Sequence, residues 1–137
     1  MATWARMAAA GWIVGFGAGV VAASPQIAQV NSTGDEYRVF CGSCHGPEGK
    51  GDGPAAKSLR KRPADLTQLA KRNEGTYPAD RAFKVIDGRV PVNGHGGPDM
   101  PAWGPIFSQS RESQTPEDVK ARIDALVRYV ETLQEKP

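Results

Sequence analysis

The chain is predicted to be all-α, from three features of its sequence. Near the C-terminus, apolar residues recur at helical spacing, at Val119, Ile123, Leu126, Val127 and Val130. No stretch alternates between apolar and polar side chains as a half-buried strand does. The 16 glycines and 11 prolines of the 137 residues punctuate long stretches between the helical segments, and these stretches are expected to be loops.

Four helical segments are expected. The first covers residues 34–44, and a glycine-rich loop follows over 46–54. Asp65 is suited to cap a short second helix that ends near residue 75. The third covers 79–87, and Gly88 supplies its C-terminal stop.

The last helix has the clearest start signal. Thr115 is a favourable N-cap residue, and Pro116 fits the first helical position. Glu117 and Asp118 lie at the positive end of the helix dipole, where carboxylates are stabilising.

The N-terminal part is expected to be a targeting segment. Arg6 precedes an uncharged apolar run over residues 8–23, which ends in small residues typical of a cleavage site. Residues 1–23 are therefore interpreted as a signal peptide, with an uncleaved membrane anchor as the alternative. A polar linker is expected over 24–33 and one domain over 34–137.

Charge excludes one class of partner. Without residues 1–23 the chain has 114 residues, of which 16 are basic and 15 acidic, and this near neutrality argues against nucleic acid. The basic residues are unevenly spread, with four between positions 57 and 62 and two at 71–72. Two interpretations stay open for this cluster: a solvated face, or a docking patch for an acidic partner.

The decisive motif is Cys41-Gly42-Ser43-Cys44-His45. Two cysteines three positions apart with a histidine after the second are the attachment signature of c-type haem. Each thiol can form a thioether with one vinyl group, and His45 can then reach the iron as the proximal ligand. The cofactor expected is one covalent haem c with its iron.

Other interpretations of the cysteine pair fit less well. A redox dithiol needs a βαβ pattern around the motif, and none is visible. A zinc site needs four ligands, and the sequence has no second Cys/His cluster.

Met100 is the expected sixth ligand of the iron. It is the only methionine after residue 23 and lies in a segment where glycine and proline block a helix. His95 is the rival candidate, because a neutral imidazole also binds haem iron.

On these residues the chain resembles the class I c-type cytochromes, in particular small bacterial monohaem types. Besides the motif, Tyr37 matches an aromatic of the family's first helix, and residues 126–129 resemble part of its last helix. Residues 63–67 and 100–104 resemble segments of bacterial periplasmic members. The resemblance implies a cytochrome c fold of four to five helices around one haem, with the first and last helices crossing.

The resemblance also implies roles for single residues. The carbonyl of Pro54 is expected to accept the N–H of the His45 ring, which orients the ring. Met100 followed by Pro101 resembles the distal ligand loop.

Further residues are expected around the haem. Leu66, Phe83 and Ile86 are expected to wall the pocket. Hydrogen bonds to the haem propionates or to nearby backbone are expected from Arg89, Trp103 and Tyr77, with ordinary packing as the alternative.

The expected function is one-electron transfer in the periplasm, and no catalytic residues are expected. The partners would be a donor dehydrogenase or cytochrome complex and an acceptor oxidase or reductase, with the membrane involved only if the N-terminal segment is uncleaved. One alternative is a dedicated electron-transfer subunit of a multi-chain oxidoreductase. Another is a haem ligand sensor or enzyme in which the bond to Met100 opens.

Overall fold

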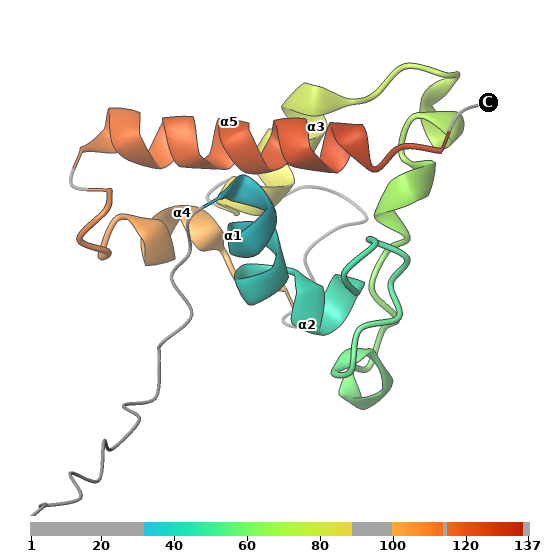
Figure 1. Cartoon of the computed structure of the whole chain (residues 1–137). Coiled ribbons are helices and arrows are strands. Elements are labelled where there is room, and N and C mark those ends of the chain that lie inside the picture. Colours follow the sequence, from blue (N-terminus) through green and yellow to red (C-terminus); the bar gives the residue numbers. More distant parts are fainter. Residues whose placement is uncertain (1–31, 89–99, 114, 136–137) are drawn as a thin grey trace, which may run out of the picture.

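The computed structural model describes residues 32–88, 100–113 and 115–135, and these ranges contain helices and no strand (Figure 1). The all-α prediction is confirmed for this part of the chain. The proposed signal peptide, Arg89 and His95 lie outside the described residues. The described elements are α1 (Thr33–Phe40), α2 (Gly42–His45), the 3₁₀ helices η1 (Ala56–Ser58), η2 (Leu66–Gln68) and η3 (Lys71–Asn73), α3 (Ala79–Asp87), α4 (Trp103–Phe107) and α5 (Pro116–Thr132).

Helix α5 begins where the sequence predicts. The side chain of Thr115 accepts a hydrogen bond from the Asp118 amide at 3.1 Å, and the Asp118 carboxylate accepts one from the Thr115 amide at 3.0 Å. This reciprocal capping box satisfies two backbone donors at the helix start. The five apolar residues predicted to form one face, Val119, Ile123, Leu126, Val127 and Val130, are all buried.

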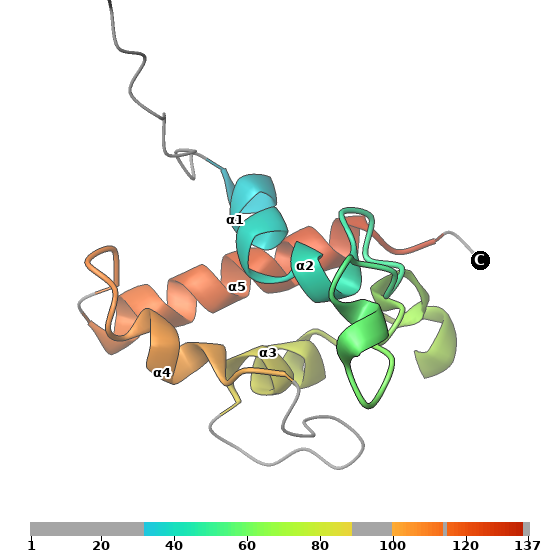
Figure 2. The same cartoon turned by 90° about the horizontal axis from the view of Figure 1, so that it is seen from below.

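Helix α1 packs across α5, as both views show (Figures 1 and 2). Tyr37 of α1 is completely buried, and its ring centroid lies 5.0 Å from that of Tyr129 on α5. Glu36 and Arg122 form an ion pair between the same helices, with side chains only 12% and 16% exposed. Because α2 follows α1 directly, this crossing also fixes the position of α2.

Helix α3 also matches its predicted range and ends at Gly88, whose φ of 69° is left-handed. A Cβ atom on Gly88 would lie 2.6 Å from the Cα atom of Ala102, so only glycine permits this approach. The contact fixes where the described chain resumes after residue 99. It thereby places Met100 close to α3.

Helix α4 was not predicted, and its sequence contains glycine and proline. Pro105 is its third residue, where a backbone N–H has no partner within the helix. Aromatic packing holds α4 in place: the Trp103 ring lies 5.3 Å from Phe40 and 5.7 Å from Phe107. The guanidinium of Arg122 lies 4.0 Å from the Phe107 ring centre and completes this cluster.

Two predicted helices differ in detail. The first begins at Thr33 with Ser32 as N-cap and is interrupted at Cys41, whose φ of −112° departs from helical geometry. The second is a pair of 3₁₀ turns, although Asp65 does cap it by accepting the Thr67 amide at 3.0 Å. The amide of Leu66 donates to the carbonyl of Gly49 at 2.7 Å, so the start of this segment is bonded to the glycine loop. Runs of 3₁₀ helix are short in general, and each of these is three residues long.

None of the described helices combines the length and the apolar composition needed to cross a bilayer.

The capping box predicts the stability of a conservative variant pair. Thr115→Ala removes the acceptor for the Asp118 amide, so we expect the free energy of unfolding to fall by about 1 kcal/mol. Thr115→Ser keeps the hydroxyl and should stay close to the parent protein. Urea unfolding followed by far-UV circular dichroism measures both, and equal midpoints for the Ala variant and the parent would contradict the role of the box.

Candidate functional site

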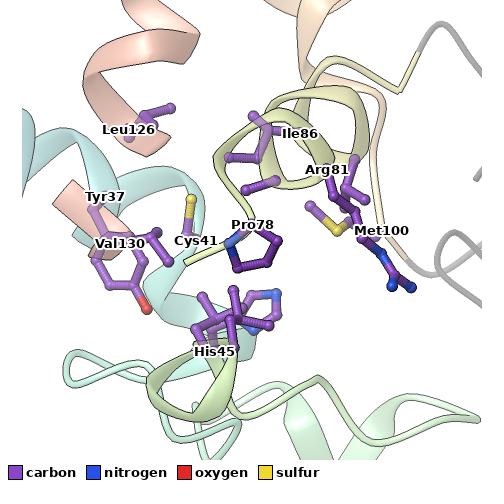
Figure 3. A pocket seen from close by; sticks show the side chains of 13 residues that line it. Tyr37, Cys41, His45, Pro78, Arg81, Ile86, Met100, Leu126 and Val130 are labelled. Atoms are coloured by element: carbon purple, nitrogen blue, oxygen red, sulfur yellow. The ribbon is translucent and has the colours of Figure 1, made fainter. Parts of the chain in front are cut away.

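An apolar pocket opens between α2, α3, α5 and the segment at Met100 (Figure 3). Its empty space is about 650 Å³ when the open solvent at its mouth is included. One face of α3 contributes most of one wall, through Pro78, Arg81, Ala82, Val85 and Ile86.

The rest of the lining comes from elements that are distant in sequence. Leu126 and Val130 of α5 and Leu66 and Leu69 of the 3₁₀ segment complete the apolar surface. Tyr37 also reaches the pocket, but its hydroxyl donates to the carbonyl oxygen of Gly46 at 3.0 Å.

Three side chains with donor atoms meet in this pocket: Cys41, His45 and Met100 (Figure 3). Cys41 and His45 lie on one helical turn, because the His45 amide donates to the Cys41 carbonyl at 2.9 Å. Met100 enters from another wall, after the gap in the described chain. A thiol, an imidazole and a thioether thus face one apolar space.

The hydrogen bond of His45 determines which ring nitrogen is available. Its Nδ1 lies 3.0 Å from the carbonyl oxygen of Ala64. A carbonyl oxygen can only accept, so Nδ1 carries the proton and Nε2 keeps its lone pair. Burial lowers the pKa of His45 below 6.5, with the bond to Ala64 acting in the opposite direction. His45 is therefore a neutral imidazole at pH 7, as a metal ligand must be.

A network of backbone hydrogen bonds brings Ala64 to the imidazole. The amide of Leu66 donates to the carbonyl of Gly49 at 2.7 Å, and the amide of Gly51 donates to the carbonyl of His45 at 2.8 Å. The glycine loop is thus bonded to α2 on one side and to the start of η2 on the other. Ala64 lies between these two attachments.

The prediction for Pro54 is wrong in this respect, because Ala64 is the acceptor. Pro54 is exposed, and it is not part of the pocket lining. The amides of the two residues that flank it, Gly53 and Ala55, donate to the carbonyls of Cys44 and Ser43 at 3.1 and 2.9 Å. Backbone amides of residues 53–55 thus donate to carbonyl groups of α2.

The two cysteines have different environments. Cys41 lines the pocket, and burial, Glu36 and Cys44 raise the pKa of its thiol to about 12. Cys44 is half-buried one residue before His45 and is not among the residues that line the pocket. Its sulfur accepts a contact from the Ser43 hydroxyl at 3.8 Å. Cys41 and Cys44 are not joined by a disulfide bond.

Other predicted pocket residues have mixed outcomes. Leu66 and Ile86 line the pocket as expected, whereas Phe83 does not and lies under the Lys120 ammonium, 5.5 Å from its ring centre. Trp103 also lies outside the lining, since it packs against Phe40 and Phe107. The Tyr77 hydroxyl donates to the Val127 carbonyl at 3.0 Å, which is a backbone bond.

Arg81 is a pocket residue that was not predicted. It lies beside Met100 in the close-up view (Figure 3). The sequence could have predicted this position, because residues 78, 81, 82, 85 and 86 recur at helical spacing on one face of α3 and its N-cap. A cation in this wall can pair with an acidic group of a bound cofactor.

The chain matches no family model, no curated protein and no solved structure in the three comparisons. Among the described residues, no three His, Cys, Asp or Glu side chains cluster as a metal site. The function is therefore inferred from the side chains of the pocket, above all Cys41, His45 and Met100.

Packing of the glycine loop against the motif predicts the effect of one added methyl group. A Cβ atom on Gly53 would lie 2.4 Å from the carbonyl oxygen of Ser43 and 2.6 Å from that of Gly42. We expect Gly53→Ala to displace the loop and to lower the free energy of unfolding by about 2 kcal/mol or more.

Gly42→Ala is the matched control for this substitution. Its Cβ atom would meet neighbours only at 3.8 Å or beyond, at ordinary contact distance. We expect its unfolding midpoint to stay at or slightly above that of the parent protein, since alanine favours a helix. Equal effects of the two substitutions in urea unfolding would contradict the close packing at Gly53.

Proposed function

We propose that the protein is a one-electron carrier with a covalent c-type haem, ligated by His45 and Met100. One observation carries the proposal: a neutral imidazole with a free Nε2 shares an apolar pocket with Met100. The adjoining motif adds two thiols in the spacing that haem attachment needs. The helical architecture is compatible with the cytochrome c fold implied by the family resemblance.

The residues of the pocket fit a haem by their chemistry. A porphyrin is a large apolar ring, and most of the lining side chains are aliphatic. Nitrogen of a neutral imidazole and thioether sulfur are both established ligands of haem iron. Arg81 supplies a positive charge on the α3 wall, which suits the carboxylates of haem.

In this proposal Cys41 and Cys44 fix the cofactor covalently. Each thiol adds across a vinyl double bond: a carbon–sulfur bond forms, the hydrogen passes to the neighbouring carbon, and no oxidant is consumed. Cys41 already faces the pocket, and Cys44 is the immediate neighbour of the proposed proximal ligand. Attachment at both cysteines would fix the position of the cofactor relative to His45.

The bound haem supplies a reversible one-electron couple. His45 and Met100 would both ligate the iron, so no position would be left for a substrate, and this would favour electron transfer over catalysis. The Ala64 carbonyl keeps the His45 ring oriented and raises its basicity. The apolar wall would limit the access of water to a bound haem, and burial of this kind tunes the reduction potential.

The proposed location is the bacterial periplasm. The uncharged run over residues 8–23 and the small residues at its end support export with cleavage of the signal. A donor dehydrogenase or cytochrome complex and an acceptor oxidase or reductase are the proposed classes of redox partner.

Covalent attachment predicts the behaviour of cysteine variants. Cys41→Ser and Cys44→Ser each remove one thioether, so we expect the double variant to release its haem on a denaturing gel stained for haem peroxidase activity. The parent protein, expressed with haem-maturation machinery, should retain the stain. Ser43→Ala changes the same turn without touching a thiol and should stain like the parent. An unstained parent band would contradict the proposed function.

Axial ligation predicts the spectrum of the Met100→Ala variant. Loss of the thioether should abolish the sulfur-to-iron charge-transfer band of the oxidised protein and lower the reduction potential, because thioether sulfur favours ferrous iron. Val85→Ala enlarges the same pocket without removing a donor atom and should keep the band. A band that persists in Met100→Ala would assign the sixth position to another residue.

A further inference from the structure

A strongly basic surface lies on the loops behind the pocket. Residues 57–72 hold six basic residues and one acidic residue, whereas the rest of the chain from residue 24 holds ten basic and fourteen acidic residues. The molecule is thus nearly neutral as a whole but electrically polarised. We call the six residues the basic patch: Lys57, Arg60, Lys61, Arg62, Lys71 and Arg72.

The charges of the basic patch are available to a partner. All six residues are exposed, and none of them forms an ion pair with another described residue. Arg72 makes one long hydrogen bond, 3.4 Å, to the carbonyl oxygen of Asp65. Ion pairs elsewhere in the described chain include Arg38 with Asp35 and Lys120 with Asp124. Two of these cations, Arg62 and Arg72, line one hollow. Unpaired cations that gather in this way create the field that steers an acidic partner.

An open hollow of about 620 Å³ joins the basic patch to the site. Arg62 and Arg72 supply its unpaired positive charges, whereas Lys50 is paired with Glu48 at 3.0 Å. Asp65 is the one acidic residue of the lining, which Pro63 and Ala64 complete. Ala64 is the residue whose carbonyl accepts the proton of His45 Nδ1 at 3.0 Å. One hydrogen bond therefore connects a lining residue of the hollow, Ala64, with a lining residue of the pocket, His45.

We propose that the redox partner docks an aspartate- and glutamate-rich surface on the basic patch and its hollow, directly behind the proximal ligand His45. This inference rests on the proposed function and identifies the chemistry of the partner. The green loops that carry the basic patch lie to one side of the helical layer in Figure 1, so a partner can approach them without displacing α5.

A protein surface fits this face better than an anionic membrane. Binding in a membrane interface needs apolar side chains that insert between lipids. The large hydrophobic residues exposed in the described structure are Val39 and Ile106, and both lie on other elements, α1 and α4. The basic patch instead offers arginine forks, which match carboxylates in pairs.

The test uses the haem-loaded, ¹⁵N-labelled protein and flavodoxin, a strongly acidic one-electron protein, as probe. Amide shifts on titration should map to residues 50 and 57–72. Binding should weaken strongly between about 0.01 M and 0.15 M ionic strength, as the screening length falls from about 30 to about 8 Å. Shifts centred on another face would overturn the proposal.

Matched charge reversals separate the basic patch from net charge. Arg62→Glu/Arg72→Glu should weaken flavodoxin binding and slow electron exchange with it by at least about tenfold at low salt. Lys84→Glu/Arg128→Glu, at exposed positions of α3 and α5, changes the net charge equally and should alter both by less than about threefold. Lys57→Glu/Lys61→Glu repeats the reversal if the arginine pair unfolds. Equal effects of patch and control variants would overturn the proposal.

Two further measurements distinguish the remaining outcomes. Electron exchange with an uncharged ferrocene mediator should be the same in all variants. If no protein exchanges electrons with it, the proposed function fails, while the amide shifts still report on docking. Binding to phosphatidylglycerol vesicles that depends on the basic patch, without flavodoxin shifts there, would overturn the protein partner in favour of a membrane.

Discussion

The hydrogen bond from His45 Nδ1 to the carbonyl oxygen of Ala64 connects the two halves of the site. It fixes the tautomer of the ring, so that Nε2 carries the lone pair, and burial keeps the imidazole neutral. Because a backbone carbonyl is the acceptor, the bond depends on the path of the chain and not on the side chain of residue 64. The glycine loop and the start of η2 determine that path, which explains their close backbone contacts with α2.

The crossing of α1 and α5 positions the other partner of this hydrogen bond, His45. Tyr37 and the Glu36–Arg122 ion pair anchor α1 on α5, and α1 leads directly into the motif. The Trp103 cluster and the approach of Gly88 to Ala102 anchor the chain on either side of the undescribed segment, next to Met100. Two independent anchors thus determine the separation between the candidate ligands, which is the arrangement that preorganisation of a metal site requires.

Sequence reasoning succeeded where the signals are local. The starts and ends of α3 and α5 follow from Thr115, Pro116 and Gly88, since caps act within one turn. It failed where a backbone atom from a distant segment decides the outcome. Ala64, and not Pro54, is the acceptor because several loop hydrogen bonds act together, and α4 was not among the predicted helices. Arg81 could have been predicted by applying the helical period of α3 to its polar residues as well. The same period would have shown that Phe83 lies on another face of the helix, where it contacts Lys120.

The central claim is that His45 and Met100 grip one haem iron within the apolar pocket. Proton NMR of the reduced protein, labelled with ¹³C at the methionine methyl group, tests it most directly. A ligating thioether lies over the porphyrin face, and the ring current should move the Met100 methyl resonance far upfield of the ordinary methionine range. A Met100 methyl resonance within the ordinary range, in a sample with its full complement of haem, would contradict the account.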